Sequence, residues 1–371
     1  MSSENGINIQ EALEHMAYEG SVITYMRYGH GHINDTFRVY TKAGDGEHQY
    51  ILQRMNKDVF KDPVALMKNI VGVTGFLRDE IVKEGGDPLR ETLNVIPSTT
   101  GESYYLDSRG DYWRSYLFID HATCYDAVEK PEDFYQSAKA FGRFQRQLSE
   151  YPAEELSETI PNFHNTPVRL DTFRQAVKAD VCGRASSVEK EIKFVLDRSD
   201  EAGIAMNMLK EGTLPLRVTH NDTKLNNIMI DDTTGEALCI IDLDTIMPGF
   251  SIFDFGDSIR FGANTVAEDE PDVSKAGLSL PLFDIYTKGY LEGCKGSLTE
   301  EEVKMLPMGA KLMTYECGTR FLTDYLQGDT YFKTTRDNQN LDRCHTQFAL
   351  VADMEKKWNE MQKIVEKYKT E

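Results

Sequence analysis

The stretch from Val218 to Asp242 carries the strongest signal in this sequence. It reads Val-Thr-His-Asn-Asp-Thr-Lys-Leu-Asn-Asn-Ile-Met-Ile-Asp-Asp-Thr-Thr-Gly-Glu-Ala-Leu-Cys-Ile-Ile-Asp. His220, Asp222 and Asn227 form the spacing His-x-Asp-x-x-x-x-Asn, and Asp242 ends a strand-like apolar run. Two short strands that flank a tight loop would bring the two carboxylates and the amide to one point.

These residue types suit phosphoryl transfer from ATP. Such a transfer needs one carboxylate to orient and deprotonate an acceptor hydroxyl, and an Asn and an Asp to hold Mg²⁺ against the phosphates. Mg²⁺ takes few protein ligands beside phosphate oxygens, so one carboxylate and one amide suffice. We therefore predict Asp222 as the catalytic base and Asn227 with Asp242 as the Mg²⁺ ligands. An Asp in a loop more often caps a helix or closes a turn, but the spacing around Asp222 favours catalysis.

Two neighbours of the predicted base receive different interpretations. We expect His220 to be a packed or hydrogen-bonding scaffold residue and not a chemical participant. Lys224 would either reach the γ-phosphate and spread its developing charge or be an ordinary exposed lysine. The sequence leaves both roles of Lys224 open.

A competing triplet, Asp254-Phe255-Gly256, spells the metal-binding motif of protein kinases. No predicted strand ends at this triplet, so we interpret the match as a coincidence. We expect Asp254 to anchor the catalytic loop, and Asp257 and Arg260 to form a polar network beside it.

Length and charge limit the class of protein. A chain of 371 residues is too long for one small core and suits two lobes. A net charge of −20 argues against a general surface for nucleic acids or anionic membranes, because phosphate backbones need clustered Lys and Arg. It does not argue against ATP, whose charge is met locally, and it would attract a cationic substrate.

The cysteines and apolar runs add expectations about location. Six cysteines occur without a Cys-x-x-Cys pair, which argues against a disulfide scaffold or a zinc site and favours a reducing cytoplasm. No run approaches the length of a membrane span, and the first residues lack the apolar core of a signal peptide. We expect a cytoplasmic protein, monomeric or weakly dimeric, without nucleic-acid or membrane partners.

The pattern of elements predicts an α+β fold, with a small β-rich lobe over residues 1–120 and a larger, mostly helical lobe over residues 121–371. In the first lobe we predict strands at residues 21–28, 35–40, 50–55, 103–106 and 112–119. Asp62-Pro63 marks the start of a helix whose apolar stripe comprises Val64, Met67, Val71 and Leu77.

Helical spacing dominates the second lobe. One helix is predicted from the apolar residues Phe134, Ala138, Phe141 and Leu148. The C-terminal stretch places further apolar residues on one face, namely Val351, Met354, Trp358, Met361 and Val365. We interpret this face as core packing.

Two short segments of the first lobe are candidates for contacts with ATP. Gly29 and Gly31 lie between two predicted strands, where backbone N–H groups could approach phosphates. Hairpin turns use Gly-x-Gly constantly, so the pattern is weak by itself, and its position ahead of the catalytic loop strengthens it. Ile119 lies where the pattern changes from strands to helices, and there an adenine would hydrogen-bond to the backbone.

A later predicted helix carries Glu316, Arg320 and Asp324 at four-residue intervals, so that they share one face. This face is either a salt-bridge ladder in solvent or a polar wall of an acceptor pocket. The spacing by itself fits both.

The chain resembles the aminoglycoside phosphotransferase and choline kinase superfamily in residues 219–227 and 240–249. Over nearly its whole length it is similar, more narrowly, to the N-acetylhexosamine 1-kinases, in residues 28–34, 50–53, 216–222 and 316–325. The resemblance implies a protein-kinase-like bilobal fold that uses ATP and Mg²⁺. The implied reaction is phosphorylation of the anomeric hydroxyl of N-acetylhexosamines (GlcNAc or GalNAc) to the sugar 1-phosphate, in amino-sugar salvage.

The resemblance also assigns roles to single residues. It implies Asp222 as the base, in contact with the sugar, and Asn227 with Asp242 as the Mg²⁺ ligands. The implied sugar contacts come from His32, Arg320 and Tyr331, which favours the pocket interpretation of the later helix. The candidates for ATP binding are Gly29, Gly31, Gln53, Lys224 and Ile119.

Gln53 departs from the wider superfamily. The third strand of these kinases usually offers a Lys to the α- and β-phosphates, and a Glu on the next helix holds it. Here Gln53 takes that position, and no Glu partner is evident between Val64 and Leu77. The phosphate charge would then rest on Mg²⁺, Lys224 and backbone donors.

Two other functions stay open. A kinase for an amine, such as an aminoglycoside or a choline-like compound, is mildly favoured by the acidic net charge and opposed by Arg320 and His32. A non-catalytic nucleotide-binding regulator would be expected to lack Asp222, Asn227 or Asp242, and all three are present.

Overall fold

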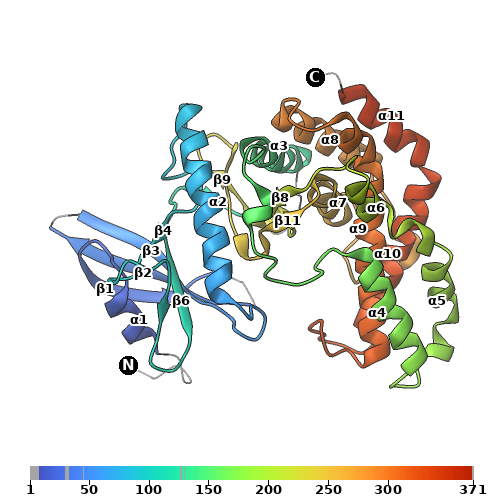
Figure 1. Ribbon diagram of the computed structural model, residues 1–371, viewed down its shortest axis with the longest axis horizontal. Helices are drawn as coiled ribbons and strands as arrows, with labels where there is room; N and C mark the ends of the chain where they lie inside the picture. The colour runs from blue at the N-terminus through green and yellow to red at the C-terminus, as the bar shows by residue number, and fades with distance from the viewer. Residues whose placement is uncertain (1–7, 30–32, 45, 126–127, 129, 370–371) are drawn as a thin grey trace. The chain divides into compact units, whose positions relative to one another are not determined.

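The computed structural model describes residues 8–29, 33–44, 46–125, 128 and 130–369. The chain divides into two compact units, which Figure 1 colours along the sequence. The smaller unit comprises Met1–Thr123, Glu155–Ile160 and Ile230–Ile246. The larger unit comprises Cys124–Glu154, Pro161–Met229 and Met247–Glu371. The chain therefore returns twice to the smaller unit after leaving it.

A six-stranded antiparallel sheet forms the body of the smaller unit. The strands run in the order β1-β2-β3-β6-β4, and β5 pairs with β6. Their bounds are β1 (Ser21–Arg27), β2 (Asp35–Ala43), β3 (Gly46–Arg54), β4 (Val95–Ile96), β5 (Tyr105–Leu106) and β6 (Tyr112–Leu117). The predicted strands are confirmed. The third begins earlier than predicted because Ala43 and Gly46 still pair, and β4 was not predicted.

The two faces of this sheet differ in polarity. On one face, α1 (Ile9–His15) packs against an apolar cluster that includes Leu52 and Trp113. Side chains alternate between the faces along each strand. The opposite face therefore carries a polar row of residues that pair in register across β2, β3 and β6, namely Thr36, Gln53 and Arg114.

Helix α2 (Pro63–Lys83) begins where the sequence predicts, because the Asp62 carboxylate accepts a hydrogen bond from the Ala65 N–H at 2.9 Å. The predicted stripe is wrong at Val64 and Val71, which are 43% and 42% exposed. The buried face is centred on Ile70 and its neighbours one turn away. At about 100° per residue, the two valines lie roughly 100° or more around the helix from that centre.

A second, three-stranded sheet has the order β10-β9-β7. Its strands are β7 (Ala122–Thr123), β9 (Ile228–Asp231) and β10 (Ala237–Ile240), and β7 pairs antiparallel with β9. Asn227 directly precedes β9, and Asp242 follows β10 by two residues. The sheet thus connects the two halves of the stretch on which the sequence analysis rests.

The larger unit is mainly helical, as predicted. Its helices are α3 (Pro131–Gln147), α4 (Thr166–Ala179), α5 (Glu189–Leu196), α6 (Ile204–Lys210), α7 (Ser251–Gly262), α8 (Leu280–Cys294), α9 (Glu300–Gln327), α10 (Gln339–Lys356) and α11 (Trp358–Tyr368). Two short strands, β8 (Arg217–Thr219) and β11 (Met247–Gly249), pair antiparallel. The predicted C-terminal face is buried at Val351, Met354, Met361 and Val365, although two helices form it where one was expected.

Helices α7 and α9 pack closely through glycine. A Cβ atom at Gly256 would lie 2.3 Å from the carbonyl oxygen of Gly309, so neither position accepts a larger side chain without movement. Gly256 of the Asp-Phe-Gly triplet therefore has a packing role, in agreement with our interpretation of that triplet as a coincidence.

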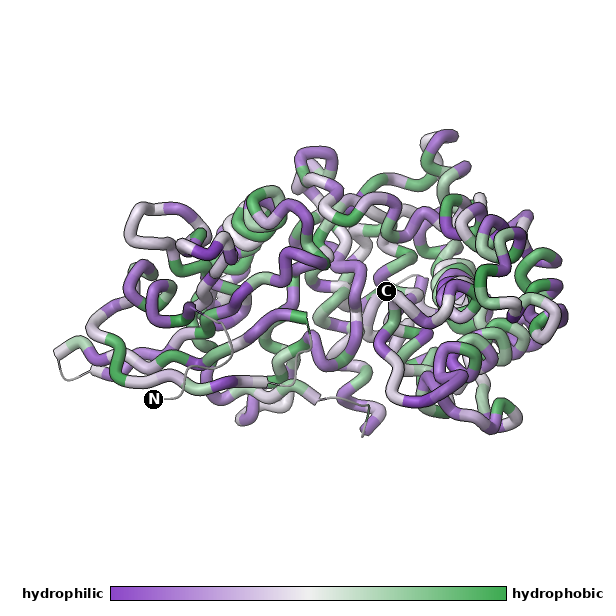
Figure 2. The backbone as a smooth tube through the Cα atoms, turned by 90° about the horizontal axis from the view of Figure 1, so that it is seen from below, coloured by the Kyte–Doolittle hydropathy of each residue, from purple (hydrophilic) through white to green (hydrophobic). Residues whose placement is uncertain are grey.

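Hydrophobic and hydrophilic residues alternate along the helices (Figure 2). Accordingly, no helix among the described residues combines the length and the hydropathy that a membrane span requires.

Candidate active site

His220 directly follows β8 and is a scaffold residue, as predicted. Its side chain is fully buried against the rings of Phe141 and Phe144, whose centroids lie 5.6 and 6.4 Å away. Its Nδ1 accepts a hydrogen bond from the Asp222 N–H at 3.3 Å. Aromatic packing and this hydrogen bond fix the backbone just before Asp222.

Asp254 anchors the catalytic loop, as the sequence predicts. Its carboxylate accepts hydrogen bonds from the main-chain N–H groups of His220 (2.9 Å) and Asn221 (2.8 Å). The Gln145 side-chain amide donates a third hydrogen bond at 3.0 Å. Complete burial raises the pKa of Asp254. Asn221 has a φ of 64°, so the loop turns sharply at the residue before Asp222.

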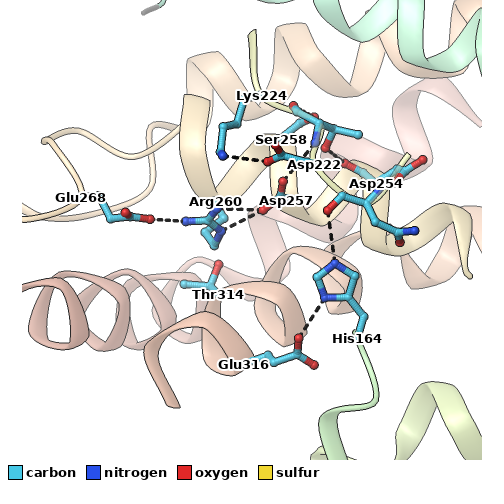
Figure 3. A network of polar contacts seen from close by, with 12 residues as sticks. His164, Asp222, Lys224, Asp254, Asp257, Ser258, Arg260, Glu268, Thr314 and Glu316 are labelled. Carbon is cyan, nitrogen blue, oxygen red and sulfur yellow. Dashed lines mark hydrogen bonds and ion pairs between the residues drawn. The ribbon is translucent and has the colours of Figure 1, made fainter. Parts of the chain in front are cut away.

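A second carboxylate of α7 holds the next part of the loop, in the network shown in Figure 3. Asp257 accepts a hydrogen bond from the Thr223 N–H at 3.1 Å and two from Arg260 at 3.0 and 2.8 Å. Arg260 also pairs with Glu268 at 2.6 Å. Burial alone would raise the pKa of Asp257, but the charges of Arg260 and Lys224 lower it below its ordinary value. The predicted polar network is confirmed.

Asp222 is partly exposed, and two residues of its own loop orient its carboxylate. The Lys224 ammonium lies 2.8 Å from one carboxylate oxygen. The amide nitrogen of Asn227 donates to the other oxygen at 3.2 Å and to the Asp222 main-chain carbonyl at 2.8 Å. Burial alone would lower the pKa of Lys224, but the neighbouring Asp222 raises it. Lys224 is therefore a charged partner of Asp222 and not an isolated surface lysine.

Asn227 has the chemistry that a Mg²⁺ ligand needs. It ends the short 3-10 turn η4 (Leu225–Asn227) and is buried. Because its amide nitrogen is used by Asp222, the amide oxygen is the atom left for a metal. Among the described residues, no group of three or more His, Cys, Asp or Glu side chains could hold a metal ion. Mg²⁺ in proteins commonly takes phosphate oxygens and water beside one or two protein ligands, and an amide oxygen can be one of these ligands.

Asp242 belongs to the smaller unit and starts the 3-10 turn η5 (Leu243–Thr245). Its φ and ψ are 59° and 55°, in the left-handed region that residues other than glycine rarely adopt. The turn is fixed by Asp244, which forms a buried ion pair with Arg114 and accepts a hydrogen bond from the Asn34 side chain at 2.7 Å.

Gln53 and Arg114 lie opposite each other on β3 and β6. The Gln53 amide oxygen accepts a hydrogen bond from Arg114 Nε at 2.9 Å, and its amide nitrogen donates to Thr36 at 3.1 Å. Burial alone would lower the pKa of Arg114, but the Asp244 charge raises it. The sequence analysis missed Arg114. A charged residue in the middle of a strand rich in aromatic residues was the available signal.

The other predicted contacts with ATP lie in the smaller unit. Gly29 has a φ of 75°, a conformation that favours glycine. Ile119 follows β6, and within the described part of the chain its main-chain N–H and C=O have no hydrogen-bond partner. Gly31 and His32 fall outside the described residues.

The face of α9 that carries Glu316, Arg320 and Asp324 is not a ladder in solvent. Glu316 and Asp324 are almost fully buried. Asp324 accepts hydrogen bonds from the N–H groups of Thr330, Tyr331 and Phe332 at 2.8–3.0 Å, so it shapes the loop that carries Tyr331. The salt-bridge alternative is therefore wrong.

Arg320 lies among aromatic rings. Its guanidinium carbon is 5.4–5.8 Å from the ring centroids of Phe163, Tyr331 and Phe332. Tyr331 is 68% exposed, and its hydroxyl lies 3.5 Å from Arg320 Nη2. The structure thus brings two of the predicted sugar-contacting residues, Arg320 and Tyr331, together.

His164 and Glu316 form a buried pair that no sequence motif indicates (Figure 3). Nδ1 of His164 lies 2.9 Å from Glu316, and Thr166 donates to the same carboxylate at 2.6 Å. Nε2 of His164 lies 3.4 Å from the Asn221 carbonyl oxygen, next to Asp222. Burial alone would raise the pKa of Glu316, but His164 lowers it. This pair connects α9 with the catalytic loop.

Comparisons with known proteins agree with this architecture. The model of a family described as the phosphotransferase enzyme family matches residues 24–284, well over half of the chain. Among solved structures, the chain is similar to a spectinomycin phosphotransferase in complex with ADP and spectinomycin. The identity is 13% and the TM-score 0.55, with 93% of this chain and 98% of that chain covered.

Two further structures of eukaryotic kinases match at similar levels. For Plasmodium vivax ethanolamine kinase, the identity is 15% and the TM-score 0.55, over 90% of this chain and 84% of that one. For choline kinase from Cryptosporidium parvum, the values are 15% and 0.52, over 92% and 91%. At such identities the likeness shows the fold alone, and it confirms the predicted α+β, protein-kinase-like architecture.

Proposed function

The chain belongs to the phosphotransferase enzyme family, and from this premise we propose that it transfers the γ-phosphoryl group of ATP to the anomeric hydroxyl of an N-acetylhexosamine. The proposal rests on the exposure and orientation of the Asp222 carboxylate. Its carboxylate is partly exposed and is oriented by Lys224 at 2.8 Å and by Asn227 at 3.2 Å. A carboxylate held in this way can accept a proton from a hydroxyl without first reorganising.

The proposed chemistry does not require a strong base. An anomeric hydroxyl is more acidic than an ordinary alcohol, because the ring oxygen stabilises the alkoxide. Asp222 would accept its hydrogen bond, align the oxygen with the γ-phosphorus and take the proton. Lys224 lies beside Asp222 and would stabilise the charge that develops on the phosphoryl oxygens. Mg²⁺, held by Asn227 and Asp242 in this proposal, would neutralise phosphate charge when bound.

The remaining roles follow the same proposal. Residues 1–120 would form the nucleotide-binding lobe, with Gly29, Gly31, Gln53 and Ile119 in contact with ATP. Residues 121–371 would form the catalytic and sugar-binding lobe. His32, Arg320 and Tyr331 would contact the sugar.

The charge around Arg320 supports a neutral acceptor over a cationic one. A second guanidinium, that of Arg169, donates two hydrogen bonds to the Phe163 carbonyl at 3.2 and 2.9 Å. Burial and the charge of Arg320 lower the pKa of Arg169, so the two cations influence each other. An amine that bound against them would be repelled, whereas sugar hydroxyls and an N-acetyl carbonyl can accept hydrogen bonds from them. A kinase for an amine is the second candidate, and the net charge of −20 favours it.

Identification of the product tests the proposal. Release of ADP should be measured with GlcNAc, GalNAc, other hexoses, choline, ethanolamine and kanamycin. The anomeric proton of the product should show coupling to phosphorus by NMR, because the phosphate is attached to C1. A methyl glycoside, whose anomeric hydroxyl is blocked, should not react. A 6-phosphate product, turnover of the methyl glycoside or a preference for amines would contradict the proposal.

A further inference from the structure

We propose that Arg114 is a positioning residue for the metal–nucleotide complex: through Asp244 it fixes the turn that carries the Asp242 carboxylate. This inference rests on the proposed role of Asp242 as a Mg²⁺ ligand. It concerns a group of four residues of the smaller unit that we call the buried anchor after its buried pair, Arg114 and Asp244; the other two, Asn34 and Gln53, are partly buried.

The buried anchor connects three strands to one turn. Arg114 on β6 donates through Nε to Gln53 on β3 and through Nη1 to Asp244 in η5. The other carboxylate oxygen of Asp244 accepts a hydrogen bond from Asn34, which directly precedes β2. Asn34 accepts in turn from the Asn56 N–H at 2.9 Å. Both oxygens of Asp244 are thus held by groups that the sheet positions.

The turn needs this support because Asp242 is in the left-handed region. A residue other than glycine persists there only where its surroundings impose the conformation. Asp242 and Asp244 are two residues apart, so a shift of Asp244 would turn the backbone and move the carboxylate of Asp242. The main-chain carbonyl of Ile246, just after the turn, accepts a hydrogen bond from Asn69 on α2 at 3.0 Å. The turn is therefore fixed at both ends, and Arg114 provides the charged attachment.

The position of Arg114 also accounts for Gln53. Gln53 lies where related kinases carry a Lys on the third strand, and its direct partner across the ladder is Arg114. Arg114 therefore places a cation one strand away from Gln53, on the same face of the sheet. The Arg114–Asp244 pair is almost fully buried, with side chains only 2% and 6% exposed.

Arginine suits this place better than lysine. The planar guanidinium donates in two fixed directions, here to Gln53 and to Asp244, whereas an ammonium group is a single point charge. Arg114→Lys keeps the positive charge but removes the two fixed directions in which the guanidinium donates. It therefore tests positioning without leaving Asp244 unpaired. Arg54→Lys on β3 is a matched control, because Arg54 lies on the same sheet and likewise contacts two acceptor side chains, the carboxylates of Asp35 and Asp111.

The experiment measures binding of ADP to the whole chain by calorimetry, with and without Mg²⁺ and with no sugar present. We expect Arg114→Lys to weaken binding of Mg²⁺–ADP about 10–100-fold, the usual effect of losing a residue that orients a metal ligand. Its affinity for ADP without metal should change less than about threefold. Arg54→Lys should leave both affinities within about threefold of wild type.

Three outcomes would overturn the inference. In the first, Mg²⁺ changes the ADP affinity of Arg114→Lys as much as that of the wild type. In the second, Arg114→Lys loses ADP affinity equally with and without Mg²⁺. In the third, Arg54→Lys shows the same selective loss of Mg²⁺–ADP affinity. If Arg114→Lys does not fold, Asn34→Ala removes the other hydrogen bond to Asp244 and should show the same selective loss. Because no sugar is present, a wrong assignment of the acceptor cannot affect the result. If the wild-type protein bound ADP equally well with and without Mg²⁺, this result would instead refute the proposed function.

Discussion

The catalytic loop of the larger unit and the Asp242 turn of the smaller unit are both held by buried carboxylates, but they differ in what those carboxylates bind. In the loop, Asp254 and Asp257 accept main-chain N–H groups that lie only 33 or 34 residues away in sequence. In the turn, Asp244 binds the side chain of Arg114, 130 residues away. Almost any residue can supply the main-chain N–H groups of the loop, so in these contacts only the identity of the carboxylate matters, whereas the contact in the turn depends on the identity of both partners.

The largest expected effect concerns the chemistry that the loop supports. Asp222→Asn should lower kcat roughly 10²–10⁴-fold, the usual contribution of a general base. ADP binding and the fold should be preserved, because the loop is held by Asp254 and Asp257 and not by Asp222. Steady-state kinetics and calorimetry on the purified variant test this. If more than half of the wild-type turnover remained, Asp222 would not be the base.

The comparison predicts that Asp254→Ala loses mainly stability, whereas Asp242→Ala loses mainly activity. Removal of Asp254 takes away the carboxylate that accepts from two buried main-chain N–H groups and from the Gln145 amide, which keeps the Val218 carbonyl as its other acceptor, so the free energy of unfolding should fall by about 3 kcal/mol or more. Asp242→Ala should lose Mg²⁺-dependent activity while its stability changes by about 1 kcal/mol or less. Thermal melts with and without Mg–ATP separate the two variants. Stabilisation by the ligand that survives in Asp242→Ala but vanishes in a folded Asp254→Ala would reverse the assignment.

The His164–Glu316 pair offers a pH-dependent test of the loop's second support. The pKa of Glu316 is held below its ordinary value of 4.5. A depressed acid stabilises the fold above the unfolded pKa, and this contribution is lost as the pH falls through the folded pKa. Glu316→Gln should therefore cost about 1–3 kcal/mol near neutral pH, and the difference from wild type should shrink below about pH 4.5. Urea unfolding across that range measures it, and a difference independent of pH would contradict the assignment.

The smallest effect is expected at the acceptor side. Arg320→Ala should raise the KM for the sugar about tenfold, by loss of one polar partner, and should change the KM for ATP less than about twofold. Arg343→Ala is a suitable control, since Arg343 also lies over an aromatic ring, that of Phe321. An equal loss of affinity for both substrates would remove Arg320 from the acceptor site.

The sequence predicted the loop well because its information is local. His220, Asp222 and Asn227 fall within one short motif, and Asp254 was expected to be their anchor. The strands of the sheet and the start of α2 were also predictable, from alternation and from the Asp-Pro cap. In α2 the apolar residues alone could not show which side is buried, because Val64 and Val71 are as hydrophobic as the residues that pack.

The contacts that the sequence could not predict join residues far apart in the chain. Nothing near Arg114 identifies Asp244 as its partner, and nothing near His164 identifies Glu316. Asp324 had the right spacing for a salt bridge, yet its carboxylate caps main-chain N–H groups of a loop that follows its own helix. Spacing predicts which side chains share a face, but it cannot show which backbone groups will approach that face.

The return of the chain to the smaller unit has a consequence for its synthesis on the ribosome. Arg114 is translated 130 residues before Asp244. At a translation rate of about 5–20 residues per second, the Asp244 carboxylate is synthesised roughly 6–26 s after the Arg114 guanidinium. Burial of the Arg114 guanidinium without a carboxylate would be unfavourable, so β6 has to remain hydrated during that time. A nascent chain that ends shortly after residue 120 should therefore be sensitive to protease along β6, and it should become resistant only once the segment to Ile246 has emerged.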